Sequence, residues 1–282
     1  MKKGLPLKPS IQNLVRRSLK EDMGKGDWTT EYLIKRKQFC RAVIQAKEKG
    51  VLAGIGICEL VFKSLNKELI FQPRKKDGEE FKKGEILAEI KGEARAILSA
   101  ERVALNFLQR MCGIATLTKM FVSKVKGTKA KIMDTRKTTP LLRNLEKYAV
   151  RVGGGRNHRS GLFDMILIKD NHLKIIGDIK KALNSVRKQN RKRLKVEIEV
   201  KNIKEFQEAQ KAGAKLIMLD NMSLKEIKEA VSQRKKGVKL EVSGGVNLKN
   251  VRAIAKTGVD YISVGSLTHS AKAIDLSLKI IS

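Results

Sequence analysis

From about residue 130 onward, short apolar segments alternate with longer stretches whose apolar residues recur at helical spacing. Six segments have the length of a buried strand: AKIMDTR, MILIKDN, LKVEIEV, AKLIMLDN, VKLEVSGG and DYISVGS. The stretches between them, such as NIKEFQEAQKAGA and SLKEIKEAVSQRKKG, begin with Asn or Ser and end with or near Gly, as helices prefer. Strands that alternate with helices predict right-handed βαβ units and a parallel sheet.

The first part of the chain, residues 1–112, has a less regular pattern. SIQNLVRRSLKEDM predicts a helix capped by Ser10, and FCRAVIQAKEKGVLAGI and EILAEIKGEARAIL alternate like strands joined by glycine turns. SAERVALNFLQRMCGIATLTKMFVSKV then predicts one long helix, or two, beginning at Ser99. This part is expected to form an α+β domain.

Each of the six predicted strands ends in polar or glycine residues, such as Asp134-Thr135-Arg136-Lys137 after the first. Parallel strands gather their carboxyl ends at one edge, where α/β barrels build their active sites and doubly wound sheets bind ligands. A barrel uses all of its strand ends for one site, whereas a doubly wound sheet binds ligands at one switch point. Because all six predicted strands end in polar or glycine residues, we favour a barrel. The six units predict an open, incomplete α/β barrel of about six or seven strands, preceded by the α+β sandwich domain.

Composition adds one strong feature, a formal net charge of +32 from 61 Lys and Arg against 29 Asp and Glu. Such a charge attracts polyanions and raises the alternative of nucleic-acid binding. Aromatic residues make up only 4% of the chain, which leaves few rings for base stacking, and the basic residues are spread along its length. We therefore expect most lysines to be solvated on helix faces and loops. Nucleic acid is not the expected partner.

The sequence predicts a cytoplasmic protein without a membrane partner. No apolar run approaches the length that spans a bilayer, and the first residues lack the apolar region of a signal peptide. The three cysteines, Cys40, Cys58 and Cys112, have neither disulfide nor metal spacing.

Five cationic or potentially cationic side chains lie at or beside the first two strand ends: Arg136, Lys137, His158, Arg159 and Lys169. Arginine binds carboxylate or phosphate in bidentate fashion, and lysine acts as a point charge. Local carboxylates that could neutralise this group are few, namely Asp134, Asp164 and Asp170. The group predicts a ligand with several negative charges.

Acidic side chains follow on the next strands. Glu197 and Glu199 lie two residues apart on one strand and so share a face, and Asp220 ends the following strand. They could hold Mg²⁺ or ribose hydroxyls. The alternative is an ion pair inside the barrel with Lys169 or Lys201.

The last two strands end in glycine-containing turns, Ser243-Gly244-Gly245 and Val264-Gly265-Ser266. Late barrel loops often bind phosphate through backbone N–H groups. The strand ends together predict a sugar phosphate with a pyrophosphate leaving group, beside a second, acidic substrate.

Several blocks in this order resemble the quinolinate phosphoribosyltransferase family: EDMGKGDWTT, SAERVALNFLQRMCGIAT, DTRKTTPLLRNLEKYAVRVGGGRNHRSGLFDMILIKDNH, VEIEV, LDN, EVSGG and VGSLTHS. They run from residue 21 to residue 270, and the long central block is the most specific. One departure is Leu141-Leu142, where the family pattern has a glycine after the proline.

The resemblance implies transfer of phosphoribosyl from phosphoribosyl pyrophosphate to quinolinate with decarboxylation, giving nicotinate mononucleotide, pyrophosphate and CO₂ for NAD biosynthesis, with Mg²⁺ as cofactor. It implies an N-terminal domain, residues 1–112, joined by the tail 271–282, and a barrel domain, residues 113–270. It also implies a dimer or a hexamer in which Arg102 enters the neighbouring subunit's site.

The resemblance further implies residue roles. Lys137, Glu199 and Asp220 are the expected catalytic residues, and the last two are the expected metal ligands. The expected quinolinate ligands are Arg136, His158, Arg159 and Lys169. The expected ligands of phosphoribosyl pyrophosphate are Lys137, Thr138, Glu199, Asp220, Ser243, Gly244, Gly245, Val264, Gly265 and Ser266.

Two other functions stay open at this point. One is a related phosphoribosyltransferase that acts on another acidic heterocycle without decarboxylation. The other is a basic nucleic-acid-binding protein, which would leave the decorated strand ends unexplained.

Overall fold

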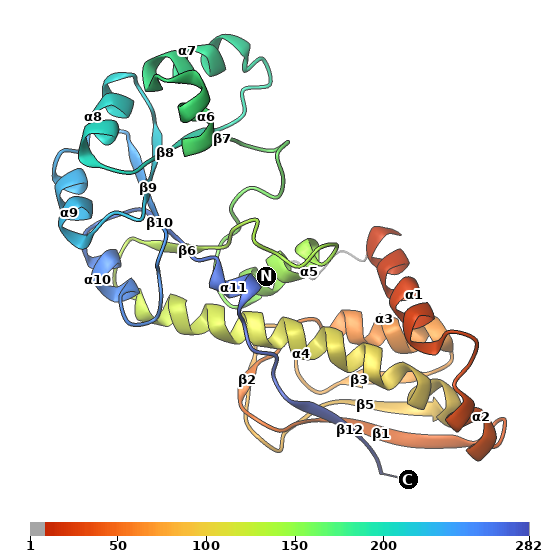
Figure 1. Ribbon diagram of the computed structural model, residues 1–282. Helices are drawn as coiled ribbons and strands as arrows, with labels where there is room; N and C mark the ends of the chain where they lie inside the picture. Colours follow the sequence, from red (N-terminus) through yellow and green to blue (C-terminus); the bar gives the residue numbers. More distant parts are fainter. Residues whose placement is uncertain (1–8, 282) are drawn as a thin grey trace. The chain divides into compact units, whose positions relative to one another are not determined.

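The computed structural model describes residues 9–281 of the 282-residue chain. Residues 1–8, part of the segment expected to lack a signal peptide, lie outside the described residues. Internal contacts divide the chain into two units (Figure 1). Unit 1 contains residues 1–119, 139–154 and 271–282, and unit 2 contains residues 120–138 and 155–270.

Unit 1 is built on a four-stranded antiparallel sheet in the order β12-β1-β5-β3, with a second, two-stranded sheet β2-β4. Its strands are β1 (Phe39–Ala46), β2 (Gly50–Val51), β3 (Ile70–Pro73), β4 (Glu80–Phe81), β5 (Ile86–Glu93) and β12 (Leu276–Ile280). Its helices are α1 (Pro9–Met23), α2 (Trp28–Leu33), α3 (Ile55–Leu65), α5 (Arg143–Val152) and most of α4 (Ala94–Lys124). The expected mixture of strands and helices is therefore present.

The tail of the chain contributes β12, which pairs with β1 from Ala42–Ile280 to Ala46–Leu276. Ile44, at the centre of β1, is fully buried, as are Leu87 and Ala88 on β5. Burial of such side chains stabilises the sheet by about 1.5–3 kcal/mol each for the larger ones. A strand from the far end of the sequence thus completes the first unit's sheet.

Two helix starts differ from the sequence expectation. The long helix α4 begins at Ala94, directly after β5, rather than at Ser99, whose hydroxyl donates to Asp27 instead. Ser10 lies inside α1, which begins at Pro9, so it is not the cap. In both cases a serine that could cap a helix lies within the helix.

The boundary between the units also differs from a single cut at residue 112. That residue lies inside α4, a continuous helix of 31 residues, and the contacts assign the helix to unit 1 up to Lys119. The segment 139–154, expected in the barrel domain, belongs to unit 1, where Glu146 of α5 accepts hydrogen bonds from Arg110 of α4. This grouping depends on contacts between segments that are distant in the sequence, which a linear pattern does not reveal.

Leu141 marks the departure from the family pattern, and its backbone has a φ of +65°. Glycine adopts this left-handed conformation without penalty, whereas other residues lose about 1–2 kcal/mol. The position where the family pattern has glycine is therefore one where the backbone favours it.

Unit 2 contains a six-stranded parallel sheet in the order β6-β11-β10-β9-β8-β7. Its strands are β6 (Lys131–Met133), β7 (Ile166–Ile168), β8 (Val196–Val200), β9 (Leu216–Asp220), β10 (Lys239–Ser243) and β11 (Tyr261–Ser263). Its helices are α6 (Asp170–Ile176), α7 (Ile179–Gln189), α8 (Ile203–Lys211), α9 (Leu224–Ser232), α10 (Val251–Lys256) and α11 (Ser266–His269). All six expected strands are confirmed.

The parallel sheet is open, because β6 and β7 stand at its two ends. Figure 1 shows α7, α8, α9 and α10 along the outside of the curved strands. Asn202 caps α8 by accepting from the backbone of Glu205, and Ser223 with Glu226 forms a capping box at α9. The expected α/β class, with an open parallel sheet after an antiparallel sandwich, is confirmed.

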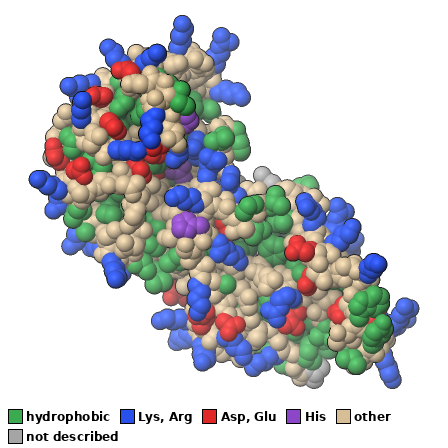
Figure 2. Space-filling view, in the orientation of Figure 1, with side chains coloured by type: hydrophobic (Ala, Val, Ile, Leu, Met, Phe, Trp, Pro, Cys, Tyr) green, Lys and Arg blue, Asp and Glu red, His purple; other side chains and the backbone are tan. Residues whose placement is uncertain are grey.

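Within residues 9–281, no helix combines the length and the apolar character needed to cross a bilayer. Figure 2 shows Lys and Arg side chains scattered over the visible face and interspersed with Asp and Glu. On this face the excess positive charge does not form one continuous basic stripe, which nucleic-acid binding would favour.

Candidate active site

A cavity of about 740 Å³ lies in unit 2 where the parallel strands end. It gathers side chains from the ends of all six strands, as the sequence predicted. The predicted residues that line it are Arg136, Lys137, His158, Arg159, Lys169, Glu199, Asp220, Ser243, Gly244, Gly245, Val264, Gly265 and Ser266. A single concave site therefore contains most of the predicted chemistry.

Two predicted site residues are not among those lining the cavity. Thr138 follows the lining residue Lys137, and its backbone N–H donates to the carbonyl of Arg136. Arg102 belongs to unit 1, where its side chain is 61% exposed and lies 3.9 Å from Glu101. Its expected role in a neighbouring subunit's site stays a prediction.

The cations at one end of the cavity are not neutralised by the protein. Within residues 9–281, Arg136, Lys137 and Arg159 form no ion pair with a carboxylate. The buried Nε of Arg136 has no hydrogen-bond partner. Burial, and after it the neighbouring charge of Arg136, lowers the pKa of the Arg159 guanidinium from its ordinary value. An anion bound here would relieve both costs.

The nearby carboxylates are engaged elsewhere, which explains why the cations stay unpaired. Asp134 accepts the backbone N–H of His158, and Asp164 accepts the backbone N–H groups of Ser160 and Gly161. Asp170 forms an ion pair of 2.8 Å with Lys201. The acids shape the loops that carry the cations and leave the positive charge for a ligand.

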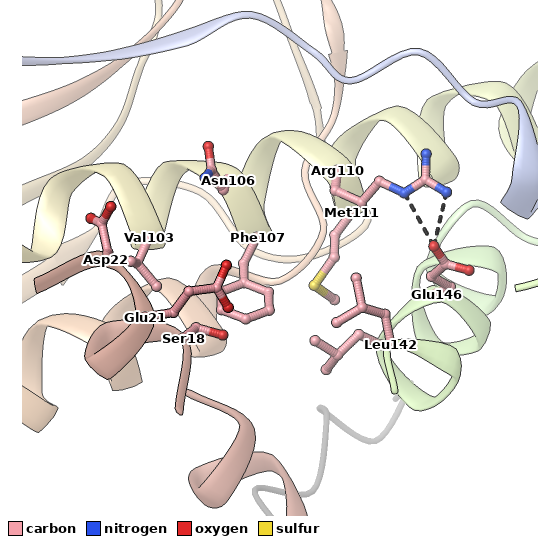
Figure 3. Close-up of a pocket in the computed structure, with 11 residues that line it drawn as sticks. Ser18, Glu21, Asp22, Val103, Asn106, Phe107, Arg110, Met111, Leu142 and Glu146 are labelled. Carbon is pink, nitrogen blue, oxygen red and sulfur yellow. Dashed lines mark hydrogen bonds and ion pairs between the residues drawn. The ribbon is translucent and has the colours of Figure 1, made fainter. Parts of the chain in front are cut away.

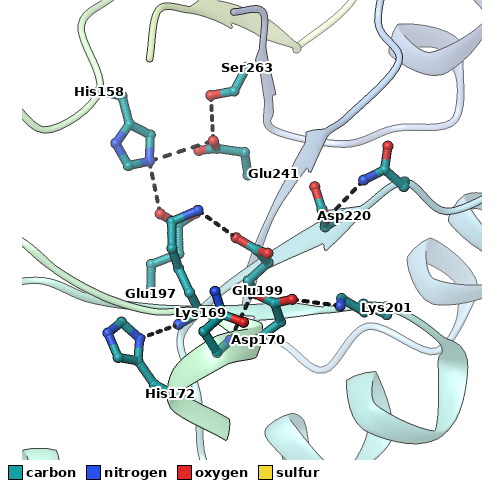
Figure 4. Close-up of polar contacts among 12 residues, drawn as sticks. His158, Lys169, Asp170, His172, Glu197, Glu199, Lys201, Asp220, Glu241 and Ser263 are labelled. Carbon is teal, nitrogen blue, oxygen red and sulfur yellow. Dashed lines mark hydrogen bonds and ion pairs between the residues drawn. The ribbon is translucent and has the colours of Figure 1, made fainter. Parts of the chain in front are cut away.

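His158 lines the cavity and contacts both the backbone and buried acids. Its Nδ1 accepts the backbone N–H of Arg159 at 2.8 Å. Its Nε2 lies 2.9 Å from Glu197 and 3.6 Å from Glu241 (Figure 4). The ring therefore lies between the Arg159 backbone and the buried acids.

Those buried acids form a polar layer with His158 and Ser263, whose hydroxyl donates to Glu241. Burial raises the pKa of Glu197 to about 8 and that of Glu241 to about 8. The ligand atoms of His158, Glu197 and Glu241 lie within 4.8 Å of one another, close enough for a metal ion. His158 and Ser263 hydrogen-bond to these acids, while the buried Oε1 of Glu197 has no hydrogen-bond partner.

Glu199 and Asp220 line the cavity from the neighbouring strands β8 and β9 (Figure 4). Glu199 accepts from Lys169 at 3.1 Å, which is the ion pair considered as the alternative. Lys201 instead pairs with Asp170. Because both carboxylates also face the cavity, the ion pair does not exclude them from a role in binding.

The glycine turns after β10 and β11 line another part of the cavity, which Lys137 also reaches. Gly244 and Gly245 have φ values of +87° and +61°, which glycine adopts freely. At Gly265, an added Cβ would lie 3.1 Å from Lys137 and 3.2 Å from Nε2 of His269. These glycines keep backbone open to a ligand and bring Lys137 and His269 close to it.

Sequence reasoning missed several lining residues. His269, which is not among the site residues predicted from the sequence, lines the cavity beside Gly265. Asn221 also lines it, and the LDN block was the available signal. The other lining residues are Thr135, Leu167, Met218, Val246 and Ser263.

Unit 1 has a cavity of its own, about 340 Å³, between α1, α4 and the segment that leads into α5 (Figure 3). Its lining mixes apolar Val103 and Met111 with acidic Glu21 and Asp22. Its arginine, Arg110, is already paired with Glu146. This cavity does not have the free positive charge that an acidic substrate requires.

The chain was compared with known proteins. Family models described as the quinolinate phosphoribosyl transferase N-terminal and C-terminal domains match residues 27–112 and residues 114–279. The chain belongs to the quinolinate phosphoribosyltransferase family. The resemblance inferred from the sequence blocks is therefore confirmed.

Individual relatives agree with the family models. A protein of Bacillus subtilis named probable nicotinate-nucleotide pyrophosphorylase (carboxylating) is 43% identical over 270 residues, covering 96% of this chain and 93% of that protein. Quinolinate phosphoribosyltransferase (decarboxylating) 1b of Nicotiana tabacum is 42% identical over 289 residues, covering 96% and 82%.

Solved structures of the same family have the same fold. The nicotinate-nucleotide pyrophosphorylase of Francisella tularensis superimposes with a TM-score of 0.91 at 40% identity and covers 99% of this chain and 100% of its own. That of Ehrlichia chaffeensis gives a TM-score of 0.92 at 43% identity, with the same coverage. Family membership does not favour the nucleic-acid-binding alternative or a transferase that lacks decarboxylation.

Proposed function

We propose that this quinolinate phosphoribosyltransferase family member transfers phosphoribosyl from phosphoribosyl pyrophosphate to quinolinate and releases pyrophosphate and CO₂. The observation that carries the proposal is the pair of arginines, Arg136 and Arg159, that face the cavity without a carboxylate partner. Quinolinate has two adjacent carboxylates, and an arginine pair can neutralise both.

The cationic end of the cavity is assigned to quinolinate. Arg136 and Arg159 bind the carboxylates, and Lys169 adds a third charge that Glu199 holds in place. His158 lies between the Arg159 backbone and Glu197, within hydrogen-bonding distance of both. The pyridine nitrogen already has a lone pair for attack, so these residues contribute by positioning it rather than by removing a proton.

The glycine end is assigned to phosphoribosyl pyrophosphate. The turns at 243–245 and 264–266 receive the 5′-phosphate through backbone N–H groups, and Lys137, with Thr138 beside it, neutralises the departing pyrophosphate. His269 adds a further polar atom next to Gly265. Glu199 and Asp220 lie near the ribosyl carbon and stabilise the positive charge that develops there.

The cavity carboxylates fit Mg²⁺, a cation that uses one or two protein carboxylates together with substrate phosphates. Asp220 and Glu199 would hold it, since both line the cavity. When bound, the ion neutralises charge on the pyrophosphate leaving group.

Decarboxylation follows from the charge on the ring. Once the ring nitrogen is bonded to ribose it is positive, and it stabilises the carbanion formed when the neighbouring carboxylate leaves as CO₂. Arg136 and Arg159 hold the ring during this step. The electron pair of the broken C–C bond stays on the ring carbon, which then takes a proton from water to give nicotinate mononucleotide.

The oligomeric state and location are also proposals. Arg102 is 61% exposed at the side chain, which suits a role in a second subunit's site, in a dimer or a hexamer. We place the protein in the cytoplasm, in keeping with thiols at Cys58 and Cys112 that are buried and free.

One assay tests the proposed function. Purified protein is incubated with phosphoribosyl pyrophosphate, Mg²⁺ and quinolinate labelled in the 2-carboxylate, with nicotinate as the control substrate. We expect nicotinate mononucleotide and labelled CO₂ in equal amounts from quinolinate and no product from nicotinate. Nucleotide formed without CO₂ would overturn the proposal.

A further inference from the structure

Asn221, directly after β9, has an uncommon backbone conformation in the proposed active site. Its φ is +55°, the left-handed region that asparagine tolerates better than most residues other than glycine. None of the roles proposed above uses this residue. It lies in the turn between β9 and α9, next to Asp220, and this place raises the question of what its side chain does.

The side chain of Asn221 contacts both halves of the phosphoribosyl end. Its Nδ2 donates a hydrogen bond of 2.8 Å to Oδ2 of Asp220. Its carboxamide also lies against Gly244, where an added Cβ would be only 2.2 Å from its Oδ1. The backbone N–H of Asn221 donates to the carbonyl of Ser243 at 2.9 Å.

We propose that Asn221 is a positioning residue that fixes the Asp220 carboxylate at a set distance from the glycine turn 243–245. Its amide orients one carboxylate oxygen, and the same amide fills the space above Gly244. The inference rests on the proposed roles of Asp220 and the glycine turn in binding phosphoribosyl pyrophosphate.

The charge and size of the side chain support this role. An amide can donate to Asp220 without adding charge, whereas an aspartate in the same place would repel it. The backbone of Gly244 can approach Asn221 this closely only because glycine lacks Cβ. Asn221 and Gly244 therefore fit one another as a pair, and each restricts the other.

A simpler explanation is that Asn221 only supplies the left-handed turn between β9 and α9. Asn221→Gly separates the two explanations, since glycine keeps the turn and removes the amide. We expect the dissociation constant and KM for phosphoribosyl pyrophosphate to rise about tenfold, the loss expected for a hydrogen bond to a charged group, with KM for quinolinate within twofold. Unchanged values for phosphoribosyl pyrophosphate would overturn the proposal.

The matched control is Arg193→Gly. Arg193 is another left-handed residue of unit 2, with a φ of +51°, and it does not line the cavity. We expect this variant to keep the parent values for both substrates. A tenfold rise in the control as well would show that the effect comes from backbone flexibility and would overturn the proposal.

A double-mutant cycle tests the contact with Gly244. Gly244→Ala should weaken binding of phosphoribosyl pyrophosphate more in the parent than in the Asn221→Gly background, where the 2.2 Å clash is absent and only the left-handed strain stays. Strictly additive effects would overturn the pairing of these residues.

Failure of the underlying site assignment has a different signature. If Asp220→Ala and Gly244→Ala both leave the affinity for phosphoribosyl pyrophosphate unchanged, the proposed site roles are wrong. If both weaken it and Asn221→Gly does not, only the inference about Asn221 fails.

Discussion

The two cavities of the molecule treat arginine in opposite ways. In unit 1, Arg110 donates two hydrogen bonds to Glu146, which is 1% exposed and also accepts from the hydroxyl of Thr139. In unit 2, Arg136 and Arg159 line the cavity without a carboxylate partner among residues 9–281. In unit 1 the charge of the arginine is balanced by a carboxylate of the protein. In unit 2 the charges of the two arginines have no such counter-charge.

This difference separates structural charge from functional charge. A buried charge that is paired and hydrogen-bonded stabilises one conformation, and removing its partner is costly. A buried charge that is left unpaired lowers stability, so its retention indicates a ligand that completes it. Substitutions in the two cavities should therefore affect different measured quantities.

The largest expected effect is on catalysis, from Arg136→Ala. We expect kcat/KM for quinolinate to fall about 1000-fold, because a charged hydrogen-bond donor to a dianionic substrate is lost, while the free energy of unfolding stays the same or rises. Steady-state kinetics and urea titration provide the two measurements. Arg156→Ala, an exposed arginine outside the cavity lining, is the control with the same charge change.

The comparison between the cavities would break if Arg136→Ala unfolded the protein while the folded fraction kept its activity. Arg136 would then be a structural residue like Arg110, and the unpaired Nε would need another explanation.

The next effect is on stability, from Arg110→Ala in unit 1. We expect the free energy of unfolding to fall by about 3 kcal/mol, because the buried carboxylate of Glu146 loses its partner. The KM for quinolinate of the folded protein should stay near the parent value. The double variant Arg110→Met with Glu146→Leu should lose less than the single one; an equal or greater loss would contradict the pairing argument.

A smaller effect is expected at His158, which contacts both the backbone of the unpaired cation Arg159 and the buried acid Glu197. His158→Gln keeps a neutral N–H that can reach Glu197, so we expect kcat/KM to fall less than tenfold, against about 100-fold for His158→Ala. If a positive charge at this position were needed, the two variants would lose the same activity. The tautomer can be checked directly by nitrogen NMR of histidine, with the N–H on Nε2 expected.

The sequence indicated the strands and their ends well, because those signals are local. Apolar runs such as VEIEV and the polar residues after them needed no knowledge of distant contacts to predict a parallel sheet and its functional edge. The cation cluster was likewise visible, since Arg136 ends the first predicted strand and Arg159 lies shortly before the second.

Other features depend on contacts that no local pattern contains. The contacts of His158 with Glu197, 39 residues away, and with the Arg159 backbone are of this kind. The grouping of segment 139–154 with unit 1 depends on contacts between distant segments, and Arg110 and Glu146, 36 residues apart, form one of them. Ser99 could cap a helix, but tertiary packing begins α4 five residues earlier, at Ala94.

The smallest expected effect is a pH dependence of stability from Glu241→Gln. Burial raises the pKa of Glu241 from 4.5 to about 8, so between these values the folded chain binds a proton that the unfolded chain has released. Stability therefore falls as pH rises through this window, and glutamine removes that fall.

We expect the difference in free energy of unfolding, variant minus parent, to increase by about 1 kcal/mol from pH 6 to pH 8. Urea titration at several pH values measures this difference. Glu208→Gln, on the exposed face of α8, is the control and should show no such trend. A gain that shrank toward pH 8 would contradict the raised pKa.

The pairing of β12 with β1 has a consequence for biosynthesis. The ribosome must translate the whole parallel sheet before residues 276–280 exist, so nascent unit 1 has a sheet edge at β1 that nothing covers. An uncovered edge invites pairing with other chains. A premature stop codon just before β12 should therefore cause aggregation in the cell, even though every residue lining the proposed active site has been made.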